Sequence, residues 1–308
     1  MLPRSLASPG GPLPSWSASW VPRLSAAPST APTARAPGTW PDHRPRGPPM
    51  SRRRDPLRIA AALALLAGLA VGGTWVWQNL GTSWVANREE SAQLRAFAQE
   101  NPLPHQVTEL RTDFENAPSG PRDGVIGTLW IPAWAGEKGV QRDTNDGRTP
   151  IKAGVTPAVL SSGAAGWFPQ SQGPGEVGNM ALAGHRRTYG DNFLHIDKLV
   201  EGDSVVVETA DAWFVYEVRV PGYLVAPNEG AAVLARAPQG MPDDGRYLTL
   251  VSCHSVTEGA WGNDHRIVVH AEAVGWLEHD AGLPPQLEGL ASTPAAASAA
   301  TRSHSAST

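Results

Sequence analysis

The sequence predicts an all-β domain, a barrel or a sandwich, preceded by one membrane-spanning helix. Two observations support this prediction. The second half of the chain holds many short runs rich in Val, Ile, Leu and aromatic residues, separated by Gly, Pro, Asn and Asp clusters. Near position 60 lies one long apolar run without a charge. No G-x-G-x-x-G motif opens a helix after a strand, so a dinucleotide-binding βαβ fold is not supported.

The two ends of the chain have the composition of disordered segments. Residues 1–56 and 282–308 are dense in Pro, Ser and Ala and show no apolar periodicity. Met50 opens a segment with the proportions of a normal start to a membrane anchor, so residues 1–49 are either an over-extended start or a dispensable cytoplasmic tail. The net charge of −4 over 308 residues gives no nucleic-acid signature, and no nucleic-acid partner is expected.

The apolar run from Ile59 to Val76 would span roughly 27 Å as a helix, close to the thickness of a bilayer core. We therefore assign residues 57–80 to a transmembrane anchor. Arginines precede the run, and the positive-inside rule then places the N-terminus in the cytoplasm and the rest outside the plasma membrane. A cleaved signal peptide is the alternative, but Trp84 occupies a position where a cleavage site needs a small residue.

Between the anchor and the C-terminal tail, the chain divides into two parts. Residues 81–122 read as a short juxtamembrane helix followed by a Pro-punctuated linker, and residues 123–281 read as the β domain. The expected strands of that domain share β-branched and apolar residues bounded by turn formers. They are residues 124–131, 179–183, 204–209, 213–220, 247–251 and 267–271.

Cys253 is the single cysteine, so an intramolecular disulfide and a Cys-rich zinc site are both excluded. A lone cysteine can be a small buried hydrophobe. Here, however, it ends the apolar run YLTLVSC, where a strand end would present the thiol to a substrate. Arg266 stands at the entrance of a later run, and His185 directly follows the run NMALAG.

These motifs, in this order, resemble the sortase family of cysteine transpeptidases over about residues 123–273. The strand Thr249-Leu250-Val251-Ser252-Cys253 is similar to the family's T-L-x-T-C motif, with Ser252 where threonine is usual. The resemblance implies a closed eight-stranded barrel with short helices. The Cys-His pair at residues 253–254 is similar to the class E branch. Asp113-Phe114 lacks the proline of the Asp-Pro-aromatic lid found in pilus-building relatives.

The resemblance also implies roles for the candidate residues. Cys253 would be the nucleophile, His185 the general acid and base, and Arg266 the residue that stabilises the oxyanion or positions the peptide. Thr249, Val251, Ser252 and His254 are candidates for lining the substrate groove. Arg186, Arg187 and Tyr189 follow His185 and are expected to fix its loop, and His195 is expected on the surface.

The implied reaction cleaves an LAxTG- or LPxTG-like C-terminal sorting signal of a secreted protein between Thr and Gly. A peptidoglycan-precursor amine would then take the acyl group. A cysteine hydrolase that gives the acyl group to water, and a catalytically silent barrel used as a scaffold, are the alternatives. No cofactor is expected: some sortases bind calcium, but no calcium motif is present. His265 and His270 with Cys253 match no standard zinc spacing, so no metal site is expected.

Overall fold

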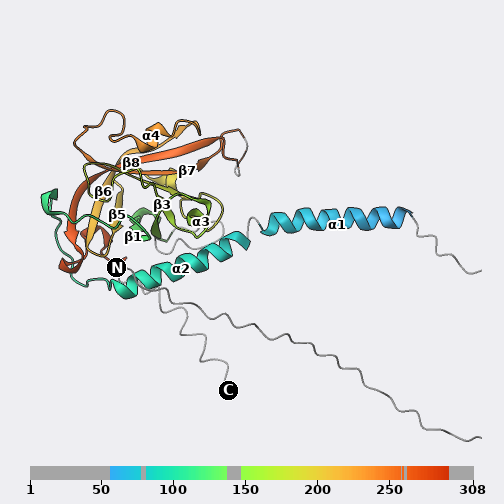
Figure 1. Cartoon of the computed structure of the whole chain (residues 1–308), viewed down its shortest axis with the longest axis horizontal. Coiled ribbons are helices and arrows are strands. Elements are labelled where there is room, and N and C mark those ends of the chain that lie inside the picture. The colour runs from blue at the N-terminus through green and yellow to red at the C-terminus, as the bar shows by residue number, and fades with distance from the viewer. Residues whose placement is uncertain (1–55, 78–80, 137–146, 258, 260–261, 291–308) are drawn as a thin grey trace, which may run out of the picture. The chain divides into compact units, whose positions relative to one another are not determined.

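The computed structural model in Figure 1 describes residues 56–77, 81–136, 147–257, 259 and 262–290. Two expectations therefore lie outside the described residues: nearly all of the predicted N-terminal tail, and the C-terminal tail from residue 291 onward.

Two helices precede the barrel. Helix α1 (Pro56–Val76) is exposed along its whole length and is long and apolar enough to cross a membrane, with a mean hydropathy of 2.0. Helix α2 (Thr82–Glu100) is mostly polar, but Ser83, Ala86 and Glu90 are buried. The buried positions are three and four residues apart, which places them on one face of the helix. Helix α2 therefore docks on the domain through one narrow stripe.

Eight strands form the domain, and they close into a barrel in the order β1-β2-β3-β4-β7-β8-β6-β5. The bounds are β1 (Val125–Trp130), β2 (Arg148–Ala153), β3 (Ala165–Trp167), β4 (Gly178–Gly184), β5 (Ser204–Glu208), β6 (Ala212–Val225), β7 (Arg246–His254) and β8 (His265–Glu278). The pairs β2–β3 and β4–β7 are parallel and the other described pairs are antiparallel. The all-β class and the closed eight-stranded barrel are thus confirmed.

Short helices lie between the strands and on either side of them in the chain. They are α3 (Pro157–Leu160), α4 (Ala231–Leu234), η2 (Phe114–Asn116), η3 (Pro132–Trp134), η5 (Ile196–Lys198), η6 (His279–Ala281) and η7 (Pro285–Leu287). The most consequential is α4, in the connection between β6 and β7, because it covers the outer face of β4 and β7 near the cysteine end of the barrel.

Alternation along the strands separates the barrel interior from its covered outer face. On β7, Leu248 and Leu250 point into the interior core, whereas Val251 belongs to an outer apolar cluster with Val233 and Val268. Cys253 follows Val251 by two residues and so projects toward this outer face. The outer cluster under α4 is therefore continuous with the surroundings of the thiol.

Two strands were not predicted, and four are longer than expected, β6 and β8 by the most residues. Strand β2 contains Pro150, which cannot donate a ladder hydrogen bond, and β3 has only three residues. Both form because neighbouring strands hold them in the closed barrel, a non-local effect. Strand β6 runs through Pro221 and Gly222, where its register against β8 shifts between Val220 and Tyr223.

The segments flanking the barrel pack onto it. In the predicted linker, Val107 bridges to Leu283, and Arg111 pairs with Trp276 through backbone bonds of 2.8 and 2.9 Å. Leu283 and Leu287 are buried against Trp213 and its neighbours. The expectation of a disordered tail from Gly282 is therefore wrong for residues 282–290. Two leucines, four residues apart within a Pro-rich sequence, supply the buried surface that orders this segment.

Candidate active site

The parallel pairing of β4 and β7 brings His185 and Cys253 to the same end of the barrel. Gly184, the last residue of β4, lies opposite Ser252 on β7. His185 directly follows Gly184, and Cys253 directly follows Ser252, so the two residues come out side by side. The Ser252 hydroxyl donates a hydrogen bond of 2.7 Å to the Gly184 carbonyl and joins the two strand ends. Ser252 is buried, which protects this bond from water.

Arg266 enters the site from β8, where it is the direct cross-strand partner of Cys253. Its Nη1 donates to the carbonyl oxygens of Asn263 and His265, at 2.8 and 2.9 Å. A guanidinium has five N–H donors, so this anchoring leaves others for a substrate oxygen. The adjacent Asp264 accepts bonds from the backbone N–H groups of Val256 and Thr257, and hydrogen bonding, chiefly from the Thr257 side chain, lowers the pKa of this carboxyl.

His185 begins a loop that folds back on its own strand. The N–H of Phe193 donates to the His185 carbonyl at 2.9 Å, and the Phe193 ring packs against Gly184 so closely that a Cβ there would lie 2.6 Å from it. The imidazole packs against the tilted Tyr189 ring at a centroid distance of 4.9 Å, and its Nδ1 lies 3.5 Å from the Thr188 hydroxyl. Burial lowers the pKa of His185.

An apolar cavity of about 370 Å³ opens on one side of Cys253. Phe168, Val233, Leu234 and Val251 line it, so the walls come from the β3–β4 region, from α4 and from β7. Cys253, His185 and Arg266 border the same cavity. A volume of this size is within the range of specific ligand sites, and its lining suits an aliphatic or extended peptide segment.

A buried chain of hydrogen bonds supports the α4 wall of this cavity. The Thr249 hydroxyl donates to Asn179 Oδ1 at 2.8 Å, so His270 Nδ1 must donate to Thr249 Oγ1, also at 2.8 Å. His270 Nε2 is then the acceptor for the Tyr223 hydroxyl at 2.8 Å. A neutral imidazole satisfies this pattern, and burial lowers the pKa of His270 to about 4.

The other end of this chain of bonds holds α4 itself. The Asn179 amide nitrogen donates to the carbonyl oxygens of Val233 and Ala235, at 3.0 and 2.9 Å. These are backbone groups in and directly after α4, a helix of four residues with little stability of its own. The wall of the apolar cavity is therefore positioned from beneath by one buried amide.

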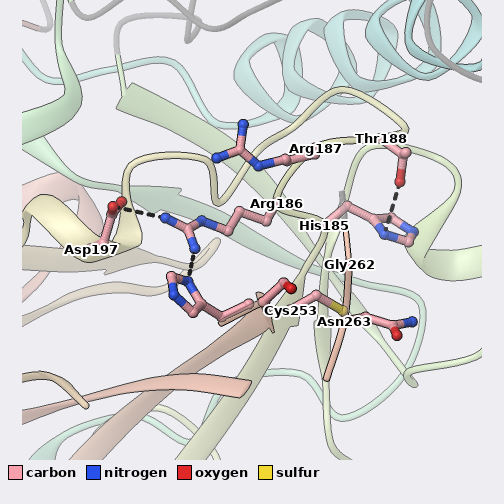
Figure 2. A pocket seen from close by; sticks show the side chains of 10 residues that line it. His185, Arg186, Arg187, Thr188, Asp197, Cys253, Gly262 and Asn263 are labelled. Atoms are coloured by element: carbon pink, nitrogen blue, oxygen red, sulfur yellow. Dashed lines mark hydrogen bonds and ion pairs between the residues drawn. The ribbon is translucent and has the colours of Figure 1, made fainter. Parts of the chain in front are cut away.

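A second, more polar cavity of about 540 Å³ also borders Cys253 and His185 (Figure 2). Arg186 projects into it and is almost fully buried, with Nη2 at 2.7 Å from the Asp197 carboxylate. Its Nη1 contacts Nδ1 of His254. Burial and the neighbouring Arg186 charge lower the pKa of His254. The cavity thus carries a fixed cation, a partly exposed carboxylate and a neutral imidazole.

The structure brings Cys253, His185 and Arg266 to one site, and it divides the four groove candidates. Val251 and Ser252 line the apolar cavity, His254 lines the polar cavity, and Thr249 is fully buried and borders neither. Thr249 therefore supports the groove from below and cannot line it. Its small polar side chain in a strand gave no signal to distinguish the two roles.

Sequence reasoning misplaced one residue and missed another. His195 was expected on the surface but is buried, because the loop after His185 folds back onto the barrel and carries it inward. Asp197, which no sequence motif singled out, pairs with Arg186 in the polar cavity. Arg186 also contacts His254, and only the tertiary fold could reveal that these three residues meet, because His254 is distant from the other two in sequence.

The Asp113-Phe114 segment lies away from the cysteine. The Asp113 carbonyl accepts a bond of 2.8 Å from the Trp276 indole, and Phe114 packs under Arg246, the first residue of β7. Cys253 is near the opposite end of that strand. Among the residues that the structure describes, no group of three His, Cys, Asp or Glu side chains could hold a metal ion. The expected absence of a cofactor stays a prediction.

Comparisons with known proteins agree with this geometry. Residues 143–274 match the model of the sortase domain. Sortase SrtE2 of Streptomyces coelicolor is 29% identical over 266 residues, which cover 77% of this chain and 92% of the relative. Sortase SrtE1 of the same organism is 28% identical over 255 residues, covering 78% and 67%. The structure of the SrtA sortase from Actinomyces oris is 37% identical, with a TM-score of 0.50, over 58% of this chain and 98% of that one.

Proposed function

The chain belongs to the sortase family of cysteine transpeptidases, and from this premise we propose that it cleaves a C-terminal sorting signal and transfers the acyl product to an amine of the cell wall. The signal would be LAxTG- or LPxTG-like, cut between Thr and Gly. The substrates would be secreted proteins, and the acceptor a peptidoglycan precursor. The class E relatives support this choice by similarity.

One observation supports transfer in particular: two different cavities meet at Cys253 and His185. A transferase must hold the acyl donor and the acceptor on either side of one nucleophile. The apolar cavity suits the aliphatic part of a sorting signal. The polar cavity, with Arg186 and Asp197, suits an amine acceptor that carries further polar or charged groups.

The first step follows from the positions of the three residues. The Cys253 thiolate attacks the threonine carbonyl, the Thr–Gly bond breaks, and His185 gives its proton to the departing glycine amine. Arg266, on the strand beside Cys253, is placed to donate hydrogen bonds to the oxyanion. The product is a thioester on Cys253. In the second step the acceptor amine attacks the thioester and gives a proton to the neutral His185, and the Cys253 thiolate leaves.

Burial of His185 sets the balance of protonation states. Because burial lowers the pKa of His185, the neutral imidazole predominates near neutral pH, and the imidazolium is the minor form. Turnover is then slow, but the imidazolium is a stronger acid toward the leaving amine.

The test is a reaction of the full chain in detergent with LAxTG and LPxTG peptides and a diamino-acid acceptor, analysed by mass spectrometry. The expected result is an amide between the peptide threonine and the acceptor, absent in Cys253→Ala. Cleaved peptide without amide would indicate a hydrolase. Unchanged product in Cys253→Ala would contradict the proposal.

A further inference from the structure

The loop that follows His185 has an uncommon backbone. Tyr189, Gly190 and Asp191 are three consecutive residues with positive φ, at 51°, 93° and 42°. Non-glycine residues in this region cost about 1 kcal/mol or more each. Such a conformation persists only where surrounding structure holds it, so the contacts of this loop are informative.

Helix α2 holds this loop from outside the barrel. The Ser83 hydroxyl accepts a bond of 3.3 Å from the N–H of Gly190. A Cβ on Gly190 would lie 3.0 Å from Asn87 Oδ1 and 3.4 Å from Glu90 Oε2. Ser83 and Glu90 are both buried, although α2 is otherwise largely exposed. The loop backbone therefore rests directly on the narrow buried stripe of the helix.

A second loop fixes the position of that stripe. A Cβ on Gly163 would lie 3.0 Å from Glu90 Cβ and 3.1 Å from the Ala86 carbonyl. The Asn192 amide in turn donates to the Gly163 carbonyl at 3.2 Å. Lys152 on β2 adds an ion pair of 3.4 Å with Glu89. Helix α2 is thus seated against the barrel on both sides of the Gly190 contact.

The loop that contains Gly190 also contacts the imidazole of His185. The ring of Tyr189, directly before Gly190, packs against the His185 ring at a centroid distance of 4.9 Å and a tilt of 34°, and the Thr188 hydroxyl lies 3.5 Å from His185 Nδ1. Contacts are therefore continuous from Ser83 through Gly190 and Tyr189 to His185. Cys253 and Arg266 have no such dependence, because the β7–β8 pairing places them.

We propose that helix α2 is a positioning element of the active site, which sets the His185 ring through Gly190 and Tyr189. The inference rests on the role given to His185 in the proposed function. Loss of the α2 contact would leave the barrel and Cys253 in place but would allow the imidazole to leave its working position. Because α2 begins at Thr82, shortly after the candidate membrane helix ends at Val76, the segment next to the membrane would form part of the catalytic apparatus.

The test compares two glycine substitutions with the same backbone strain. Gly190→Ala adds a methyl group against α2, at φ 93°. Gly202→Ala is the matched control, because its φ is 92° and a Cβ there meets nothing within 4 Å. Both are made in the full chain in detergent, with Ser83→Ala as a milder variant should Gly190→Ala fail to fold. The measurements are kcat, KM, the melting temperature and the NMR titration of the His185 ring, assigned with His185→Gln.

Gly190→Ala is expected to lower kcat about 10- to 100-fold with little change in KM, as misplacement of a catalytic group does. The His185 titration should move toward higher pH as the ring becomes more exposed. Gly202→Ala should lose similar stability but keep the wild-type kcat and titration. Ser83→Ala should change kcat and the His185 titration in the same direction as Gly190→Ala, by a smaller amount.

Wild-type kcat and titration in folded Gly190→Ala and Ser83→Ala would overturn the inference and leave the proposed function standing. A lowered kcat without a change in the His185 titration would also overturn it, because the substitution would then reduce activity by a route other than the position of the His185 ring. A moved titration with unchanged transfer would uphold the positioning by α2 and would contradict the role of His185 in the proposed function.

Discussion

Ser252 shows how one buried side chain can align two candidate catalytic residues. Its hydroxyl joins the ends of β4 and β7 at the Gly184 carbonyl, one residue before His185 and one before Cys253. Ser252→Ala would leave that carbonyl without this donor and is expected to cost about 1–3 kcal/mol in unfolding free energy. Because the strand ends would separate, kcat should fall more than KM rises.

Chemical denaturation and steady-state kinetics would check this prediction. Ser252→Thr is the control, since it keeps the hydroxyl and should retain most of the activity. Equal kinetics in Ser252→Ala and the wild type would show that strand pairing alone aligns the two residues.

His270 gives the barrel a defined response to pH. Its pKa is about 4 in the folded chain against 6.5 for an exposed histidine, so the unfolded state binds more protons between these values. The stability that depends on a neutral His270 is therefore complete above about pH 6.5 and is lost as the pH falls toward 4. At pH 5 the expected loss is about 2 kcal/mol relative to pH 7.

Urea denaturation at pH 7 and pH 5 would measure this loss. His270→Asn should be less stable than the wild type at pH 7 but should lose about 2 kcal/mol less between the two pH values. A pH dependence identical to that of the wild type would show that other groups cause the acid sensitivity.

At the scale of elements, the sequence predicted those parts of the fold whose local pattern agrees with their tertiary role. Strands β1, β4 and β5 are largely apolar runs bounded by turn formers, and each was expected within one residue of its bounds. Strands β2 and β3 were not predictable, because Pro150 and a length of three residues carry no local signal. They form because pairing with the neighbouring strands holds them in the closed barrel.

The candidate site shows the same division. Cys253, His185 and Arg266 each lie at or next to the end of an apolar strand, which made them visible in the sequence. Nothing in the sequence indicated the contacts that Arg186 makes with Asp197 and His254, or the contact of Glu90 with the barrel. These contacts depend on segments that lie far apart in the chain. Interactions of that kind follow from tertiary packing and leave no periodic pattern.

Helix α4 is the element whose position should govern donor binding. It forms one wall of the apolar cavity, and the Asn179 amide holds its carbonyl groups. Asn179→Ala would remove both bonds and one partner of Thr249. We expect KM for the sorting-signal peptide to rise several-fold, with a smaller change in kcat, because Cys253 and His185 remain on β7 and after β4.

Peptide titration of the initial transfer rate would measure this effect. Amine titration under the same conditions is the internal control, because the polar cavity does not include α4. A rise in KM for the amine with none for the peptide would show that the two cavities have been assigned to the wrong substrates.

At the scale of the whole molecule, the single cysteine can report on which side of the membrane the barrel lies. The proposed topology places the N-terminus in the cytoplasm and Cys253 outside. Cys253 is partly exposed and borders both cavities, so a maleimide can reach it. A membrane-impermeant maleimide should therefore label the chain in intact cells, and Cys253→Ala should remain unlabelled. Labelling that requires permeabilised cells would reverse the assigned orientation.

The intact mass of the chain during a single turnover tests the central claim most directly. With a sorting-signal peptide and no amine, the full chain should gain the mass of the acyl fragment on Cys253, and added amine should remove it as a peptide–amine product. Cys253→Ala should gain no mass. Absence of the adduct, or transfer in Cys253→Ala, would contradict acyl transfer through a thioester at this site.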